Sequence, residues 1–160
     1  MISLLFSLCI TVPATMPLSP AQKRNVCKYE HLIQKHSEEN NLNPALLASI
    51  IYVESGFWPR VVSRANACGL TQVIPKYTGG PETGFKKYTC EQLKKPHISI
   101  AVGAKILAYV IRVYAKGDLD KGLCYYNAGN ACITKKNFYK KLYYVKKVRK
   151  IYDKINNHNH

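Results

Sequence analysis

Apolar residues recur at helical spacing over most of this chain. Between residues 97 and 115 they include Ile100, Ala104 and Leu107, which are three or four positions apart and therefore share one helix face. The more polar segment 22–40 shows the same repeat at Val26, Tyr29 and Ile33. No alternating apolar stretch is long enough for a useful strand, so the pattern predicts a mainly α fold.

The most apolar of these helices is predicted for residues 44–54, and it has clear start and stop signals. Asn43 is a good N-cap, and Pro44 suits the first helical position. Gly56 and Pro59 end the apolar run, so the helix stops close to residue 55.

Glu54 lies at the end of that helix, on its apolar side. Leu47, Ile50 and Ile51 precede it by seven, four and three residues, spacings that place all four side chains on one face. A carboxylate on such a face loses hydration, which disfavours its charged form and raises its pKa. A general acid working near neutral pH needs such a shift, so Glu54 is a candidate catalytic residue.

The rest of the chain alternates irregular and helical segments. Residues 57–95 are rich in Gly, Pro, Thr and Lys and have no sustained period, which predicts loops and short helical turns. Asp118 can cap a short helix that carries Leu119, Leu123 and Tyr126 and ends at Gly129. A final basic helix is predicted for residues 135–154. The expected architecture is one compact helical domain with an irregular central segment.

An apolar leader precedes this domain. Residues 2–12 are almost wholly apolar, too few to span a bilayer, and prolines at 13, 17 and 20 follow. We expect residues 1–21 to be a signal or export segment and residues 22–157 to form the domain. No Lys or Arg precedes the apolar run, so an uncleaved anchor or packing segment stays open as the alternative.

Charge and cysteine content narrow the setting. The formal net charge of +15 predicts an anionic partner: nucleic acid, an acidic membrane surface, or an acidic cell-wall polymer. Six cysteines favour an oxidising compartment, although the sequence does not decide among their possible pairings.

Four short motifs occur in fixed order across the domain. They are Glu54-Ser55-Gly56-Phe57, then Ala67-Cys68-Gly69-Leu70-Thr71-Gln72-Val73-Ile74-Pro75, then Tyr126-Asn127-Ala128-Gly129, and finally Tyr144-Val145 with Val148 and Tyr152. Their order and spacing over residues 26–153 resemble the soluble lytic transglycosylase (SLT) catalytic domain, a family similar in fold to goose-type lysozyme.

The resemblance implies a reaction with a single carboxylate. Members of the family cut the β-1,4 bond between N-acetylmuramic acid and N-acetylglucosamine in peptidoglycan and leave a 1,6-anhydromuramyl end. Glu54 would serve as the acid and then as the base. No cofactor is expected. No metal is expected either, because Cys27, His31 and His36 lack a second ligand pair at zinc spacing.

Five further residues match substrate-binding positions of the family. Ser63 would orient the Glu54 carboxylate, and the amide of Gln72 would hold an N-acetyl or hydroxyl group of the glycan. Tyr126 and Asn127 would line the groove, and Tyr144 would donate a hydrogen bond to Glu54.

The sequence departs from the family pattern at three places. Thr71 replaces the usual methionine, which predicts a changed floor in one sugar subsite. Asn66 replaces a glycine, a change that a turn tolerates because asparagine adopts positive φ more readily than most residues. Tyr125 replaces an alanine and is expected to face outward. Cys68 is expected to be a small buried hydrophobe, since no histidine close in sequence could make it a nucleophile.

Two other functions remain open at this stage. One is a muramidase on the same fold that adds water instead of closing the sugar ring. The other is a basic module that binds glycan or nucleic acid without catalysis, using the terminal helix with Tyr139, Tyr143 and Tyr144. That module would leave Glu54 without a role, so no specific nucleic acid is expected.

The expected partner is therefore the glycan strand of peptidoglycan, together with anionic membrane or cell-wall polymers. The expected location is outside the cytoplasm, in the periplasm or cell envelope. A secretion or conjugation apparatus, wall turnover, or a bacteriophage particle would each fit.

Overall fold

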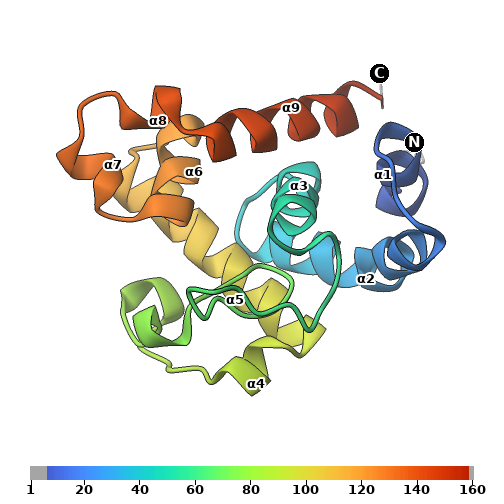
Figure 1. Cartoon of the computed structure of the whole chain (residues 1–160), viewed down its shortest axis with the longest axis horizontal. Helices are drawn as coiled ribbons and strands as arrows, with labels where there is room; N and C mark the ends of the chain where they lie inside the picture. Colours follow the sequence, from blue (N-terminus) through green and yellow to red (C-terminus); the bar gives the residue numbers. More distant parts are fainter. Residues whose placement is uncertain (1–6, 159–160) are drawn as a thin grey trace.

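The computed structural model describes residues 7–158, and the regular elements among them are helices (Figure 1). The elements are α1 (Leu8–Thr15), α2 (Pro20–Glu39), α3 (Pro44–Ser55), η1 (Pro75–Tyr77), η2 (Pro81–Thr83), α4 (Cys90–Leu93), α5 (Pro96–Tyr109), η3 (Val110–Tyr114), α6 (Leu119–Ala128), α7 (Ala131–Thr134), α8 (Phe138–Lys141) and α9 (Tyr143–Asn157). Within the described range, extended pairing is limited to isolated bridges of Cys68 with Val62 and with Val73. The predicted mainly α fold with an irregular central segment is confirmed.

Helix α3 lies at the centre of the molecule, between α2 on one side and α9 on the other (Figure 1). Leu47 and Ile51 join the core formed with α1, α2 and the end of α9. Leu46 and Ile50 join a second core formed with α5, α6 and the start of α9. A helix that is apolar all round must be covered all round, which explains why this segment is the central one.

Both ends of α3 are as predicted. The Asn43 side chain accepts a hydrogen bond from the Ala45 amide at 2.8 Å, and Pro44 occupies the first turn. Gly56 adopts the left-handed conformation with φ of 58°, and its amide donates to the Tyr52 carbonyl at 2.9 Å. The chain therefore leaves the helix two residues after Glu54.

The segment Pro96–Tyr114, made of α5 and η3, is long and apolar enough to cross a membrane by length and composition alone. Its apolar side chains are instead used inside the fold, where Ile100 and Ala104 enter one core and Leu107 the other. This is the behaviour of a core helix in a helical domain.

The C-terminal helix is shorter than predicted. The expected helix over 135–154 is wrong in its first part, where the chain forms the short helices α7 and α8 before α9 begins at Tyr143. Asn137 has a left-handed φ of 56°, and Leu142 is extended with ψ of 118°, so neither residue can continue a helix.

The described part of the apolar leader forms α1, which packs on the domain. Leu8 and Val12 are fully buried in the core that α2, α3 and α9 share, and Cys9 forms a disulfide with Cys27 of α2. Residues 1–6 lie outside the described range. The structure thus shows how an uncleaved segment would pack, and cleavage of residues 1–21 stays a prediction.

All six cysteines are paired in the structure. Besides Cys9–Cys27, the disulfides are Cys68–Cys90 and Cys124–Cys132, which join residues 22 and 8 positions apart. Such bonds are characteristic of proteins that fold in an oxidising compartment.

Candidate active site

The end of α3 is hydrogen-bonded to the turn formed by residues Gly69–Gln72. The Ser55 hydroxyl donates to the Leu70 carbonyl oxygen at 2.8 Å and to the Ile51 carbonyl oxygen at 3.0 Å. Ser55 is buried, so these bonds are protected from water. The residue next to Glu54 therefore sets the position of the Gly69–Gln72 turn.

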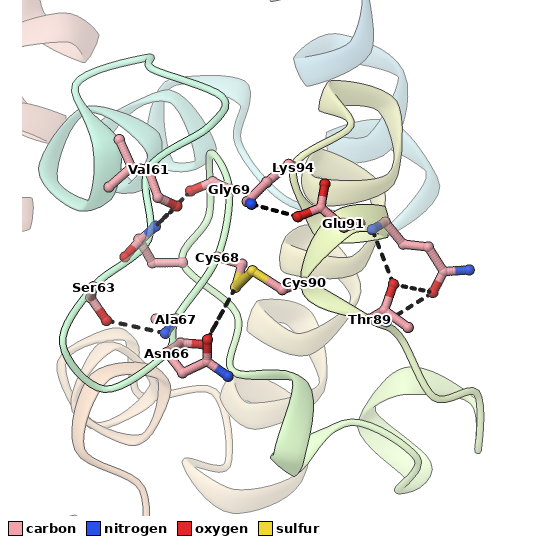
Figure 2. The surroundings of a disulfide bond; sticks show 12 residues. Val61, Ser63, Asn66, Ala67, Cys68, Gly69, Thr89, Cys90, Glu91 and Lys94 are labelled. Carbon is pink, nitrogen blue, oxygen red and sulfur yellow. Dashed lines mark hydrogen bonds and ion pairs between the residues drawn. A yellow bond between two sulfur atoms is a disulfide. The ribbon is translucent and has the colours of Figure 1, made fainter.

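That turn needs a glycine at position 69. A Cβ there would lie 1.9 Å from the Leu93 carbonyl oxygen, and φ is +80°. The Gly69 amide donates to the Val61 carbonyl at 2.9 Å, which draws the chain leaving α3 against the turn (Figure 2). Close backbone packing thus explains the glycine.

Gln72 ends the turn with a left-handed φ of 50°. Its side-chain nitrogen donates to the Val61 carbonyl at 3.0 Å and to the Gly69 carbonyl at 2.9 Å. These two bonds use both hydrogens of the amide, so the oxygen Oε1 remains as an acceptor. The geometry suits an N–H or O–H donor on a sugar.

From the sequence, Thr71 was expected to change the floor of a sugar subsite. In the structure its side chain instead points into the fold. Its side chain is fully buried, and its hydroxyl donates to the Ser99 carbonyl at 2.8 Å. A Cβ on Gly103 of α5 would lie only 2.4 Å from the Thr71 Cβ. Thr71 therefore fixes the turn to α5 from the inside, a task for which a short polar side chain is suited.

The Glu54 side chain is partly exposed, and its carboxyl group lies where α3, α6 and α9 meet. Loss of hydration raises its pKa from 4.5 to about 7, although the Tyr144 hydroxyl and the Lys147 ammonium act in the opposite direction. At neutral pH the group therefore exists in comparable amounts of the acid and the carboxylate. A group with both forms available can give up a proton and take one back.

Two tyrosine hydroxyls lie near this carboxyl group. Tyr126 of α6 donates to the Thr71 carbonyl at 2.8 Å, and burial together with the charge of Glu54 raises its pKa far above the usual value. The Tyr144 hydroxyl of α9 is buried without a hydrogen bond of regular geometry to any described residue. It lies close enough to Glu54 to lower the pKa of that carboxyl group as a donor, and its own pKa is raised chiefly by burial.

Ser63 lies in the loop before the Gly69–Gln72 turn, and Asn127 lies on α6. The Ser63 hydroxyl oxygen accepts from the Ala67 amide at 3.1 Å and so holds the loop before the turn (Figure 2). Asn127 is exposed near the end of α6, one residue after Tyr126. No contact of either residue with Glu54 is seen, and their roles in binding stay predictions.

Disulfides brace two segments that carry site residues, the loop at Cys68 and the end of α6. Cys68 is buried as expected, but it is bonded to Cys90 at the start of α4 instead of acting as a free small hydrophobe (Figure 2). Cys124–Cys132 closes the segment that contains Tyr126 and Asn127. The sequence could not predict this arrangement, because spacing alone does not select a pairing.

Lys147 is a residue that the sequence reasoning missed. It lies three positions after Tyr144 on α9, half-buried, and its charge lowers the pKa of Glu54. The helical spacing from Tyr144 was the available signal, since residues three apart share a face. Within residues 7–158, no three His, Cys, Asp or Glu side chains gather closely enough to hold a metal ion.

Comparison with known proteins supplies the family. The family model for the transglycosylase SLT domain matches residues 31–148. The membrane-bound lytic murein transglycosylase C of Haemophilus ducreyi is 35% identical over 98 residues, 58% of this chain and 26% of the relative. The protein of the same name from Haemophilus influenzae is 40% identical over 52 residues, 32% of this chain and 15% of the relative. The matched regions thus span about a quarter or less of these relatives.

Solved structures show the same fold at low sequence identity. The 70-kDa soluble lytic transglycosylase of Escherichia coli matches with a TM-score of 0.67 and 22% identity, over 82% of this chain and 24% of that chain. A complex of the 70-kDa soluble lytic transglycosylase with bulgecin A matches with a TM-score of 0.68 and 20% identity, over 86% of this chain and 25% of that chain. The lysozyme-like fold predicted from the sequence is confirmed.

Proposed function

This chain belongs to the transglycosylase SLT domain family, and from that premise we propose that it is a peptidoglycan lytic transglycosylase. It cleaves the β-1,4 bond between N-acetylmuramic acid and N-acetylglucosamine and leaves a 1,6-anhydromuramyl end. The observation that carries the proposal is the poorly hydrated Glu54 carboxyl, with a pKa of about 7, beside two tyrosine hydroxyls. Relatives named lytic murein transglycosylase support the substrate class.

In the first step, protonated Glu54 gives its proton to the glycosidic oxygen as the bond to the anomeric carbon breaks. The leaving N-acetylglucosamine keeps that proton as its new hydroxyl. The muramyl ring is left with oxocarbenium character, which its own N-acetyl group helps to stabilise. Glu54 is then a carboxylate.

In the second step, the same carboxylate removes the proton from the C6 hydroxyl of the muramyl sugar. The oxygen of that hydroxyl bonds to the anomeric carbon and closes the 1,6-anhydro ring. Glu54 is protonated again, so acid and base uses cancel over one cycle. No water is consumed, which is why a second carboxylate to activate water is not required.

The neighbours of Glu54 support its ionised form between the two steps. The buried Tyr144 hydroxyl, which lacks another regular partner, is available to donate to the carboxylate. Lys147 adds a positive charge near the same group. Gln72, with only its amide oxygen free, is suited to accept from a sugar hydroxyl or N-acetyl N–H.

The setting that fits this activity is the cell envelope. Three disulfides and a substrate that lies outside the cytoplasm favour the periplasm or the cell surface. The matched relatives carry the name membrane-bound, which agrees with an envelope location. A secretion apparatus or a phage particle is an equally suitable carrier.

Product analysis on purified peptidoglycan tests the proposal. Wild-type protein is expected to release muropeptides that are lighter than the hydrolytic products by the mass of one water, whereas Glu54→Gln releases none. Products with reducing ends would show the muramidase alternative. Full activity of Glu54→Gln, with its helical circular dichroism spectrum intact, would exclude both mechanisms.

A further inference from the structure

We propose that α7, α8 and the exposed face of α9 form a docking surface for a membrane rich in anionic phospholipid. We call this surface the basic edge. Its cations are all exposed, and they are Lys135, Lys136, Lys140, Lys141, Lys146 and Lys150. Two exposed apolar side chains, Ile133 and Tyr143, lie among them. Figure 1 shows these three helices together along one outer edge of the fold.

The charge of the basic edge is not neutralised by the protein. Between residues 121 and 152 the sequence holds nine lysines and arginines and no aspartate or glutamate. Of the carboxylates that flank this stretch, Asp118 pairs with Lys121 and Asp120 with Arg149, each at 3.4 Å, and Asp153 forms no ion pair with any of the six lysines. Among the described residues, none of the six lysines has a carboxylate within 4.0 Å. Such a surface attracts anions over about 10 Å at 0.1 M salt.

The geometry of α9 suits a flat anionic surface. Tyr143, Lys146 and Lys150 follow one another at spacings of three and four, and all are exposed. The opposite face of the helix is buried through Tyr144, Val145 and Val148. The outward stripe is therefore held rigidly by the packing of the inward one.

The exposed apolar side chains favour lipid over a soluble polyanion. Tyr143 is 74% exposed and Ile133 is 59% exposed, and each is two residues from a lysine in the sequence. An aromatic ring and an aliphatic side chain gain free energy when they enter the headgroup region of a bilayer. The long lysine stems let the ammonium groups reach lipid phosphates at the same time.

Vesicle binding by the Glu54→Gln protein tests the proposal without any contribution from catalysis. We expect binding to vesicles of phosphatidylcholine mixed with phosphatidylglycerol, weakening as salt rises, and little binding to phosphatidylcholine alone. Each lysine near an anionic surface contributes about a fivefold factor, so the added changes Lys146→Gln and Lys150→Gln should lower partitioning about thirtyfold. Equal binding to both kinds of vesicle would overturn the proposal.

A matched control removes the same charge from another part of the molecule. Lys86 and Lys95 are exposed and flank α4, at the opposite edge of the fold from α9 in Figure 1. In the Glu54→Gln background, Lys86→Gln with Lys95→Gln should leave partitioning onto the vesicles close to that of Glu54→Gln alone. If this pair weakens binding as much as the α9 pair, net charge is the cause and the basic edge is not a docking surface.

A neutral substitution separates lipid from other polyanions. Tyr143→Ser should weaken vesicle binding and leave retention on double-stranded DNA unchanged, because only the bilayer offers an apolar layer to the ring. Unchanged vesicle binding would contradict the lipid assignment and indicate general polyanion attraction. With Glu54 intact, the variant Lys146→Gln with Lys150→Gln should digest purified peptidoglycan as fast as wild type. A loss of lipid binding can therefore be distinguished from a failure of the proposed function.

Discussion

The Ser55 hydroxyl donates to the Leu70 carbonyl oxygen at 2.8 Å, so the residue beside Glu54 is bonded directly to the turn that ends in Gln72. This single contact joins two motifs that lie 15 residues apart in the sequence. It helps to fix the Glu54 carboxyl, proposed here as the catalytic group, relative to the amide expected to hold the substrate. The motifs are close in space because a side chain of one satisfies the backbone of the other.

Replacing Ser55 by alanine should therefore cost both stability and activity. The buried Leu70 carbonyl would lose its partner, at about 1–3 kcal/mol of unfolding free energy. The turn would also become looser, so kcat should fall. Denaturant unfolding and peptidoglycan turnover measure the two effects.

Ser49→Ala is the matched control, because Ser49 is buried in the same helix and donates only to the Ala45 carbonyl at 2.6 Å. That carbonyl remains bonded within the helix, so the control should lose little stability and keep its activity. Equal behaviour of the two variants would show that the Ser55–Leu70 bond does not position the site.

Glu54→Gln should be more stable than wild type at alkaline pH. The folded state holds the carboxyl at a pKa of about 7, against a usual value of 4.5. Below pH 4.5 the carboxyl is protonated in both the folded and the unfolded state, so it does not lower the stability of the fold. As pH rises through this window the unfolded state ionises first, so wild type loses about 3 kcal/mol relative to Glu54→Gln. Unfolding free energies measured across that pH range should show this difference growing.

The opposite sign is expected at Glu91. The Lys94 ammonium, 2.6 Å away, lowers the pKa of that exposed carboxyl. Any effect of Glu91→Gln should therefore be a loss of stability at pH values above the usual pKa of a glutamate.

For Glu54→Gln, a stability difference from wild type that does not change with pH would mean that the Glu54 carboxyl is not shielded from water.

The sequence predicted the parts of this site that depend on helix periodicity. Asn43, Pro44 and Gly56 marked the ends of α3, and the spacing of its apolar residues placed Glu54 on a packed face. It did not predict where Thr71 points, because the contact with Ser99 and Gly103 joins segments about 30 residues apart. The sequence also did not predict that the helix expected over 135–154 is interrupted at Asn137. The interruption depends on the left-handed conformation of that one residue, which a lysine-rich composition does not reveal.

Lys147→Met should move the alkaline limb of the pH–rate profile to higher pH. The Lys147 charge lowers the pKa of Glu54, so its removal raises that pKa and keeps the acid protonated further into the alkaline range. The measured quantity is the midpoint of the limb in kcat/KM, not the rate itself.

Lys146→Met is the control for net charge. Lys146 is the neighbouring residue on α9 but is exposed on the outward stripe. Its loss should leave the midpoint in place. A shift of the same size for both variants would indicate a general electrostatic effect instead of a specific one.

The Cys68–Cys90 disulfide should matter for activity as well as for stability. It closes a segment of 22 residues that begins at the turn of the site, and its loss should cost about 3 kcal/mol. We expect the Cys68→Ser and Cys90→Ser double variant to melt at a lower temperature and to turn over more slowly even where it is folded.

The disulfide Cys9–Cys27 offers the comparison, since its sequence separation of 18 is similar but it joins α1 to α2, elements that contribute none of the site residues. Its removal should lower the melting temperature by a similar amount and change kcat much less. Equal losses of kcat for the two variants would show that the effect is only one of stability.

The two tyrosines near Glu54 should respond differently to loss of their hydroxyls. Tyr126 donates to the Thr71 carbonyl, so Tyr126→Phe removes a partly buried hydrogen bond and should cost about 1–3 kcal/mol of unfolding free energy. Among the described residues the Tyr144 hydroxyl has only its looser contact with Glu54, so Tyr144→Phe should cost less stability than Tyr126→Phe. Thermal unfolding of both variants measures this contrast.

Activity should show the opposite order from stability: Tyr144→Phe, the more stable variant, should be the less active one. Without the Tyr144 hydroxyl the carboxylate loses a donor, so the pKa of Glu54 rises and the first step, in which the acid gives up its proton, slows. Tyr144→Phe should thus remain well folded, lose kcat and shift its alkaline limb upward. A stable Tyr144→Phe protein with wild-type kcat and an unmoved limb would remove Tyr144 from the mechanism and leave Glu54 to act without it.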